Sequence, residues 1–256
     1  MNTFIDTHSH LYLEQFDEDR SDVVDRAVEA GVRRILLPNI EKATYDAMMA
    51  MTIQYPDTCF SMIGLHPCSV KENFEAELNF VERELGTEQH IAIGEIGLDY
   101  YWDTSFIKEQ EIAFRLQLNW AKETGLPVAI HCRDSMSDIL KFIREEQDGR
   151  LRGVLHCFTG TVDEGKELID IGLHLGLGGV ITFKNGGMDK VIPHLPLDKM
   201  ILETDAPYLT PVPFRGKRNE SAYIPYIADR LAEFLEMPVE GVAVATTMNA
   251  RALFNI

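Results

Sequence analysis

The sequence predicts an α/β protein: a (β/α)8 barrel of the TIM type, formed by one domain with a short C-terminal helical extension. Three observations predict this fold, namely eight short apolar or β-rich runs, helical segments between them, and 256 residues with 45% hydrophobic content. A chain of this length can bury one large core, and alternating strands and helices are typical of a parallel sheet. An open, doubly wound sheet is the main alternative.

The predicted strands are short apolar or β-rich runs that recur along the chain. In order, they are Thr3–His8, Arg33–Leu37, Cys59–Leu65, Ile91–Glu95, Pro127–His131, Gly153–His156, His174–Leu177 and Lys199–Thr204. Runs of this length indicate buried strands, and eight of them equal the number in a closed TIM-type barrel.

Apolar residues at helical spacing separate the predicted strands. Residues 23–28 and 112–121 show this spacing, and Ile112 and Leu116 are among their apolar positions. The predicted extension consists of two further helical segments, Tyr223–Leu235 and Val239–Leu253. No Pro-, Ser- or Gly-rich linker and no internal repeat divides the sequence, so we expect a single barrel domain over residues 1–256.

The composition restricts the class of partner and the compartment. A formal net charge of -17 disfavours a broad duplex-binding surface, because a surplus of lysine and arginine normally meets backbone phosphates. The sequence shows no leader-like segment and no apolar run long enough to span a bilayer, so we expect a cytoplasmic protein without a membrane partner. The four cysteines, Cys59, Cys68, Cys132 and Cys157, lack Cys-x-x-Cys spacing and favour reduced thiols.

Residues suited to metal binding follow the predicted strands at their carboxyl ends, where barrels of this type place their active sites. His8 and His10 are two residues apart, so a strand would project both imidazoles to the same side. The other residues at strand ends that could bind metal or act in catalysis are His66, Glu95, His131, His156 and Asp205. Chance placement would not select strand ends so consistently, and the set therefore predicts one site.

The predicted ligands are imidazoles and carboxylates, a donor set that favours Zn, Mn, Fe, Co or Ni, whereas Mg prefers more oxygen ligands. We expect His8, His10 and Asp205 to hold one ion, because the first and last strands of a barrel are neighbours. The histidines that end the fifth and sixth strands would hold a second ion, and Glu95 would span both. The cysteines that directly follow these two histidines should point into the helix layer. Two adjacent ions favour hydrolysis.

Seven motifs occur in order along nearly the whole chain. They are Asp6–His10, Gly64–Pro67, Gly94–Tyr100, His131–Arg133, His156–Gly160, Glu203–Leu209 and Arg215–Glu220. Together they resemble the TatD family of metal-dependent deoxyribonucleases, within the amidohydrolase-like metal-dependent hydrolases. The resemblance implies a TIM-type barrel, a divalent-metal site and hydrolysis of phosphodiester bonds in DNA. The metal ligands that it implies are His8, His10, Glu95, His131, His156 and Asp205.

One position departs from the usual pattern of that family, in which a proline follows Asn-Glu. Here Ser221 follows Asn219 and Glu220. Because serine can cap the helix that follows, we expect little effect on the chemistry.

Three residues are candidates for catalytic roles. Asp205 could orient the attacking water and take its proton, and Glu95 could act between the two ions. His66 could contact the scissile phosphate or the leaving group, or it could cap the turn before Pro67. Glu203 shares a strand face with Asp205 and could either support the site or belong to the core.

Basic and aromatic residues near the strand ends are candidates for substrate contacts. Arg133, Arg215, Lys217 and Arg218 could bind phosphates, although the last three could equally form a solvated basic loop. The aromatic run Tyr100–Trp102 could stack on an unpaired base, or it could pack as core or as a lid.

Three functions are consistent with these residues. The first is a two-metal deoxyribonuclease, an exonuclease acting on DNA ends or single strands, because the acidic chain disfavours broad duplex contact. The second is a hydrolase of a carboxylic ester or amide-type bond, such as an aminoacyl-nucleic-acid deacylase, using the same site. The third is a non-catalytic scaffold, against which the complete ligand set argues. Zn, Mn and Mg are all candidate ions, and no obligate protein partner is evident.

Overall fold

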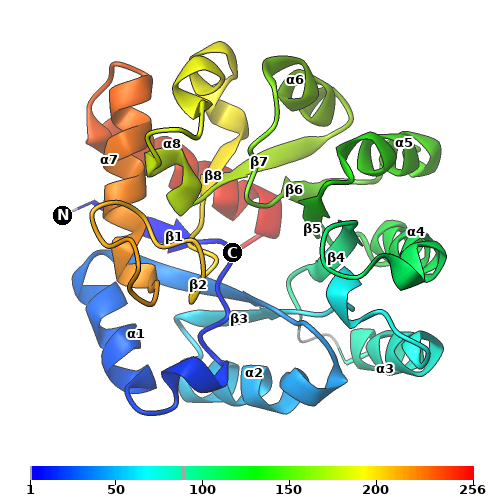
Figure 1. The fold of residues 1–256 in the computed structure, drawn as a ribbon. Helices are drawn as coiled ribbons and strands as arrows, with labels where there is room; N and C mark the ends of the chain where they lie inside the picture. The colour runs from blue at the N-terminus through cyan, green and yellow to red at the C-terminus, as the bar shows by residue number, and fades with distance from the viewer. Residues whose placement is uncertain (1, 88–89) are drawn as a thin grey trace.

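Eight parallel strands form the centre of the computed structural model, which describes residues 2–87 and 90–256 (Figure 1). The strands are β1 (Phe4–Asp6), β2 (Val32–Pro38), β3 (Cys59–Met62), β4 (Ile93–Asp99), β5 (Val128–Arg133), β6 (Gly153–Leu155), β7 (Leu173–Leu177) and β8 (Met200–Leu202). Strands β1 to β3 pair in sequence order, and so do β4 to β8. Parallel bridges from Ile63 to Ile93 and from Ser9 to Ala206 close the ring. The predicted barrel is confirmed.

Helices form an outer ring around these strands (Figure 1). Six of them each follow one of the first six strands: α1 (Arg20–Glu29), α2 (Lys42–Gln54), α3 (Phe74–Leu85), α4 (Ile107–Thr124), α5 (Met136–Glu146) and α6 (Val162–Asp170). The predicted C-terminal helices are α7 (Ile224–Phe234) and α8 (Val239–Phe254). Local sequence fixes several helix ends: a capping box between Thr161 and Glu164 begins α6, and Gly125, in the left-handed region, ends α4.

The seventh strand–helix unit differs from the predicted pattern. In residues 178–199, all of which are described, four short 3-10 helices take the place of an α-helix: Gly179–Thr182, Met188–Lys190, Ile192–His194 and Leu197–Lys199. Gly186 and Gly187 disfavour a continuous helix, and Pro193 and Pro196 each lack a backbone N–H. The chain therefore returns to β8 through a series of tight turns.

The packing of α4 also differs from expectation, and the difference bears on the site. Ile112 and Leu116 are 56% and 38% exposed, whereas Gln110 and Gln117 are buried. Gln117 Oε1 accepts a hydrogen bond of 2.8 Å from the backbone N–H of Leu65. Gln110 Oε1 accepts one of 2.9 Å from the backbone N–H of Asp99. The amides of α4 thus fix the backbone at the ends of β3 and β4.

Most of the buried side chains form one core between the strands and the helices. A second cluster joins residues on or beside seven of the strands with the end of α8, and it consists of Ile5, Leu36, Met62, Ala92, Ala129, Val154, Ile201, Ala250, Leu253 and Phe254. Figure 1 shows α8 crossing behind the ring of strands. The barrel is thereby closed at the end away from the carboxyl termini of its strands. No helix in the described ranges is long and apolar enough to cross a membrane.

Ser221 has a different role from the predicted helix cap. Its Oγ donates a 2.6 Å hydrogen bond to Asp6 Oδ2, to which Thr204 Oγ1 also donates at 2.6 Å. Burial raises the pKa of Asp6 to about 7, although these hydrogen bonds act in the opposite direction. The hydroxyl of Ser221 therefore satisfies a buried carboxyl group at the end of β1.

Candidate metal centre

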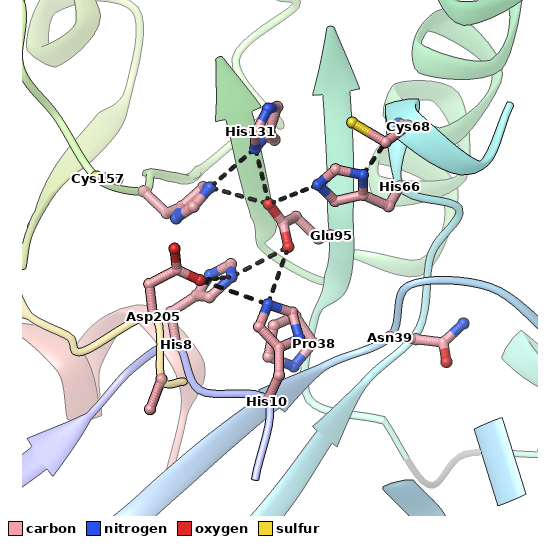
Figure 2. Close-up of polar contacts among 12 residues, drawn as sticks. His8, His10, Pro38, Asn39, His66, Cys68, Glu95, His131, Cys157 and Asp205 are labelled. Carbon is pink, nitrogen blue, oxygen red and sulfur yellow. Dashed lines mark hydrogen bonds and ion pairs between the residues drawn. The ribbon is translucent and has the colours of Figure 1, made fainter. Parts of the chain in front are cut away.

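The seven residues predicted for metal binding or catalysis meet at the carboxyl ends of the strands (Figure 2). Glu95 lies within β4 and His131 within β5. The other five follow strands: His8 and His10 after β1, His66 after β3, His156 after β6 and Asp205 after β8. The strand pairing shifts register between Ile93 and Ile96, around Glu95. Such irregularities re-aim side chains, and here the Glu95 carboxylate points into the centre of the cluster.

The buried carboxylate of Glu95 separates the histidines into two groups (Figure 2). Its Oε2 lies 3.1 Å from His8 Nε2 and 3.4 Å from His10 Nε2. Its Oε1 lies near three other imidazole nitrogens: His66 Nε2 at 3.2 Å, His131 Nδ1 at 3.0 Å and His156 Nε2 at 2.9 Å. Each oxygen therefore faces a different set of nitrogen donors, a geometry suited to a carboxylate between two ions.

Asp205 lies beside the first group. Its Oδ1 is 3.5 Å from His10 Nε2 and 3.9 Å from His8 Nε2. Burial acts to raise the pKa of Asp205, but the contact with His10 and the charges of nearby histidines hold it below its usual value. Three sets of ligand atoms lie mutually within 4.8 Å: His8–His10–Glu95, His8–His156–Asp205 and His66–Glu95–His131.

The hydrogen bond at the other nitrogen of His66 restricts its role. The Cys68 N–H donates to His66 Nδ1 at 3.0 Å, so in the neutral imidazole this nitrogen must carry the lone pair. The proton then lies on Nε2, which faces Glu95 Oε1. His66 is close enough to be counted among metal ligands, but this tautomer makes it a hydrogen-bond donor into the centre.

Asp99 orients His131, a role that the sequence reasoning did not assign. Asp99 Oδ2 lies 2.9 Å from His131 Nε2, while Oδ1 accepts 3.0 Å bonds from the N–H groups of Tyr101 and Trp102. Burial acts against the anion, yet these hydrogen bonds hold the pKa of Asp99 well below its usual range. An ionised Asp99 places the proton of neutral His131 on Nε2 and leaves Nδ1 free as a ligand. The position of Asp99 within the motif Gly94–Tyr100 was the available signal.

Tyr12 orients His10 in the same way. Its hydroxyl donates to the Pro38 carbonyl at 2.6 Å and lies 2.8 Å from His10 Nδ1. The hydroxyl therefore accepts the proton of Nδ1 and leaves Nε2 as the lone-pair nitrogen that faces Glu95. Tyr12 was also missed, because nothing in the sequence indicated the contact with Pro38.

Glu203 lies beneath His156, fully buried. Its Oε1 accepts a hydrogen bond from the Cys157 N–H and lies 3.7 Å from His156 Nδ1. Gly176 leaves room for this side chain, since a Cβ there would approach Glu203 Oε2 to 2.2 Å. Glu203 thus supports the position of His156 from within the barrel.

The electrostatics of the cluster fit divalent cations. Burial acts to raise the pKa of Glu95, but the surrounding histidines, His66 and His156 first, hold it well below its usual value. Burial lowers the pKa of His8, which favours the neutral form that binds metal. The buried Nδ1 atoms of His8 and His156 have no hydrogen-bond partner among the described residues. The pKa values of His10, His131 and His156 are raised, because acidic neighbours, Glu95 among them, outweigh the burial of these histidines; a bound cation would take the place of their protons. Ionised carboxylates and deprotonated imidazoles form a donor set for Zn or Mn.

A cavity of about 750 Å³ opens above these residues, and its walls correct one expectation. Cys132 and Cys157 were expected to point into the helix layer, but both line this cavity, as does Cys68. The alternation of a strand does not extend to Cys157, because β6 ends at Leu155 and Cys157 has a φ of 49°. Cys132 lines the cavity while also packing against the core.

The predicted phosphate-binding arginines occupy different surroundings. Arg133 lines the cavity, and its guanidinium lies 4.0 Å from the ring centroid of Tyr101. Arg215 lies over Phe183, and Arg218 pairs with Asp19 at 2.7 Å. Of the described lysines and arginines, Arg133 alone lines the cavity.

A model of the family described as TatD related DNase matches residues 5–255 of this chain. The chain belongs to the TatD family. A relative from Bacillus subtilis, named as the uncharacterized metal-dependent hydrolase YabD, is 41% identical over 98% of both chains. The relative named 3′-5′ ssDNA/RNA exonuclease TatD from Pectobacterium carotovorum is 35% identical, covering 96% of this chain and 97% of its own.

Solved structures of the TatD family agree with the fold. YjjV, a TatD homolog from Escherichia coli, superposes with a TM-score of 0.93 at 30% identity, covering 99% of this chain and 98% of its own. Family membership and the cluster of imidazole and carboxylate ligands make the protein a metal-dependent hydrolase of ester bonds.

Proposed function

We propose that this protein is a two-metal deoxyribonuclease of the cytoplasm, an exonuclease that hydrolyses phosphodiester bonds at the ends of single-stranded DNA. The observation that carries the proposal is the Glu95 carboxylate between two groups of histidines at the floor of one cavity. The relatives named as 3′-5′ ssDNA/RNA exonucleases support a nucleic-acid substrate, and RNA is therefore included in the test below.

The residues present fit two divalent ions, with Zn, Mn and Mg as candidates. His8 and His10 with Glu95 Oε2 would hold one ion, with Asp205 beside them, and His131 and His156 with Glu95 Oε1 would hold the other. Bound there, the ions would lower the pKa of water and offset negative charge on a phosphoryl group.

Asp205 is the proposed general base. Its low pKa leaves it ionised at neutral pH, and its side chain keeps some exposure to the cavity, at 15%. An ionised carboxylate accepts but does not donate hydrogen bonds, so Asp205 can hold a water molecule by one hydrogen and then take the proton.

His66 and Arg133 are the proposed contacts to the phosphate. The Nε2 proton of His66 points into the cluster and could be donated to a phosphate oxygen or to the leaving oxygen. Arg133 lines the same cavity and could pair with a non-bridging oxygen. Arg215 and Arg218, which lie outside the cavity wall, would contact phosphates farther along the strand.

One observation favours a second candidate, the hydrolysis of a carboxylic ester or amide-type bond, as in an aminoacyl-nucleic-acid deacylase. Among the described lysines and arginines, only Arg133 lines the cavity, which suits a neutral carbonyl better than a polyanion. The net charge of -17 over the whole chain also disfavours binding of a polyanion such as DNA.

The test uses metal-stripped protein supplied separately with Mg, Mn and Zn, and 5′-labelled single- and double-stranded DNA and single-stranded RNA. Removal of nucleotides from the 3′ end gives a ladder of labelled products, whereas removal from the 5′ end releases a labelled mononucleotide. Glu95→Gln should abolish cleavage, while Glu233→Gln, an exposed carboxylate that pairs with Arg230 on α7, should not. If folded, metal-loaded protein leaves all strands intact but hydrolyses an aminoacyl ester, the second candidate replaces the first.

A further inference from the structure

Exposed aromatic side chains border the cavity on two sides. Trp102, 66% exposed, follows β4, and Tyr208, 50% exposed, follows β8. Both line the cavity that contains the metal centre. In a closed ring of eight strands β4 and β8 are four strands apart, so these two rings approach the cavity from opposite sides of the barrel. Exposed apolar side chains that gather at a cavity are typical of a ligand-binding site.

The first of these aromatic surfaces is a cluster of two rings and a guanidinium. Tyr101 and Trp102 meet edge to face with centroids 5.0 Å apart, and Arg133 lies 4.0 Å from the first ring and 5.2 Å from the second. The backbone N–H groups of both aromatic residues donate to Asp99, which also orients His131. This surface is therefore fixed relative to the metal centre.

The second surface is fixed by the segment that carries Asp205. The Tyr208 N–H donates to the Asp205 carbonyl at 2.8 Å, and Asn219 Nδ2 donates to the Tyr208 carbonyl at 2.6 Å. Asn219 is buried and also donates to the carbonyl of Thr204. Each exposed ring is thus attached by backbone hydrogen bonds to a residue of the metal centre or its support.

We propose that the Tyr101–Trp102 surface and Tyr208 bind the two nucleobases that flank the scissile phosphate, one on each side of the metal centre. This inference rests on the proposed nuclease function and adds the element that selects unpaired strands. A duplex covers the faces of its bases, whereas the faces of unpaired bases are free to stack on aromatic rings whatever the sequence.

The charge distribution supports stacking as the main source of affinity. Among the described lysines and arginines, Arg133 alone lines the cavity, and it already lies against the aromatic pair. Counterion release at one or two phosphates gives only a shallow dependence of binding on salt. Stacking on both sides of the bond would supply affinity that the net charge of -17 otherwise opposes.

The test compares kcat/KM for single-stranded oligonucleotides that carry either a normal nucleotide or an abasic residue on one side of the first bond cleaved. Wild-type protein should prefer the normal strand by about 5- to 150-fold at each position, the range that base–aromatic stacking gives. Trp102→Ala should remove this preference on one side of the bond, and Tyr208→Ala should remove it on the other. Trp102→Phe should restore most of it.

Tyr226→Ala is the matched control, because Tyr226 is an aromatic residue, 41% exposed, that does not line the cavity. In Tyr226→Ala, the ratio of kcat/KM for the normal strand to kcat/KM for the abasic strand should equal the ratio in wild type. Equal cleavage of normal and abasic strands by wild type, or wild-type ratios in both alanine variants, would overturn this inference while leaving the nuclease function intact. Failure of wild type to cleave any strand would instead refute the proposed function.

Discussion

Replacing Asp99 by asparagine tests whether the proton position on His131 controls metal binding. The amide oxygen of asparagine can still accept from the N–H groups of Tyr101 and Trp102, so the loop should keep its conformation. The amide nitrogen then faces His131 Nε2, which lies 2.9 Å from Asp99 Oδ2 in the native protein. Two donors would meet unless the imidazole moves its proton to Nδ1, and that proton would occupy the lone pair that faces Glu95.

The magnitude follows from the lost contact. A hydrogen bond to a charged group contributes about 1.5–3 kcal/mol, and loss of a residue that orients a ligand histidine lowers metal affinity about 10- to 100-fold. The two figures agree, since a 10- to 100-fold change corresponds to about 1.4–2.7 kcal/mol. Metal affinity of Asp99→Asn should therefore fall by this factor, and kcat/KM should recover in part when metal is raised to saturation.

Competition with a coloured chelator measures this affinity for Zn or Mn, and thermal melting of the metal-free protein measures folding independently. The control is Asp103→Asn, which removes a nearby carboxylate that pairs with Lys71 instead of a histidine. Wild-type metal affinity in a folded Asp99→Asn protein would refute the assigned role of Asp99. A drop in thermal stability without any change in affinity would show that Asp99 only holds its loop.

Three further predictions concern stability, each measured by thermal or urea unfolding. Gly176→Ala should destabilise the protein by about 1–3 kcal/mol, because its methyl group would overlap Glu203. Gly178→Ala is the control, because its methyl group would lie 3.6 Å from Glu203, at ordinary contact distance. Equal stabilities of the two variants would contradict this prediction. Ser221→Ala removes a donor from a buried carboxyl group and should cost about 1–3 kcal/mol; a neutral result would show that water replaces the hydroxyl. Burial lowers the pKa of His90 to about 4. The neutral imidazole therefore contributes fully to the free energy of unfolding above pH 6.5, and this contribution is lost as the pH falls towards 4. Between pH 7 and pH 5, the free energy of unfolding should fall by about 2 kcal/mol more in wild type than in His90→Gln. Parallel pH profiles of stability for the two proteins would exclude this effect.

Local patterns in the sequence predicted the barrel well. Each apolar run corresponds to a strand within a few residues, because parallel strands buried on both faces need continuous apolar sequence. The histidines at strand ends met as expected, because the carboxyl ends of parallel strands lie at one rim. The seventh unit departed from this pattern where glycine and proline interrupt the helical spacing.

Contacts between distant residues were not predictable in this way. The hydrogen bond from Tyr12 to Pro38 and the contact of His131 with Asp99 join residues of different strand–helix units, and no local spacing specifies them. Cys157 was misplaced because the alternation of a strand was extended past its end. The proton position on His66 depends on one backbone N–H, which a sequence motif does not reveal.

The bridge between Ser9 and Ala206, which joins the first and last strands, also determines when the site can form. Thr204 and Asp6 lie 198 residues apart in sequence, and the hydrogen bonds between them hold the two ends of the ring together. During synthesis, His8 and His10 leave the ribosome early but lack Asp205 until most of the chain has been made. In the proposed two-metal site, the ion beside Asp205 would therefore gain its full set of ligands only late in biogenesis, after the ring has closed.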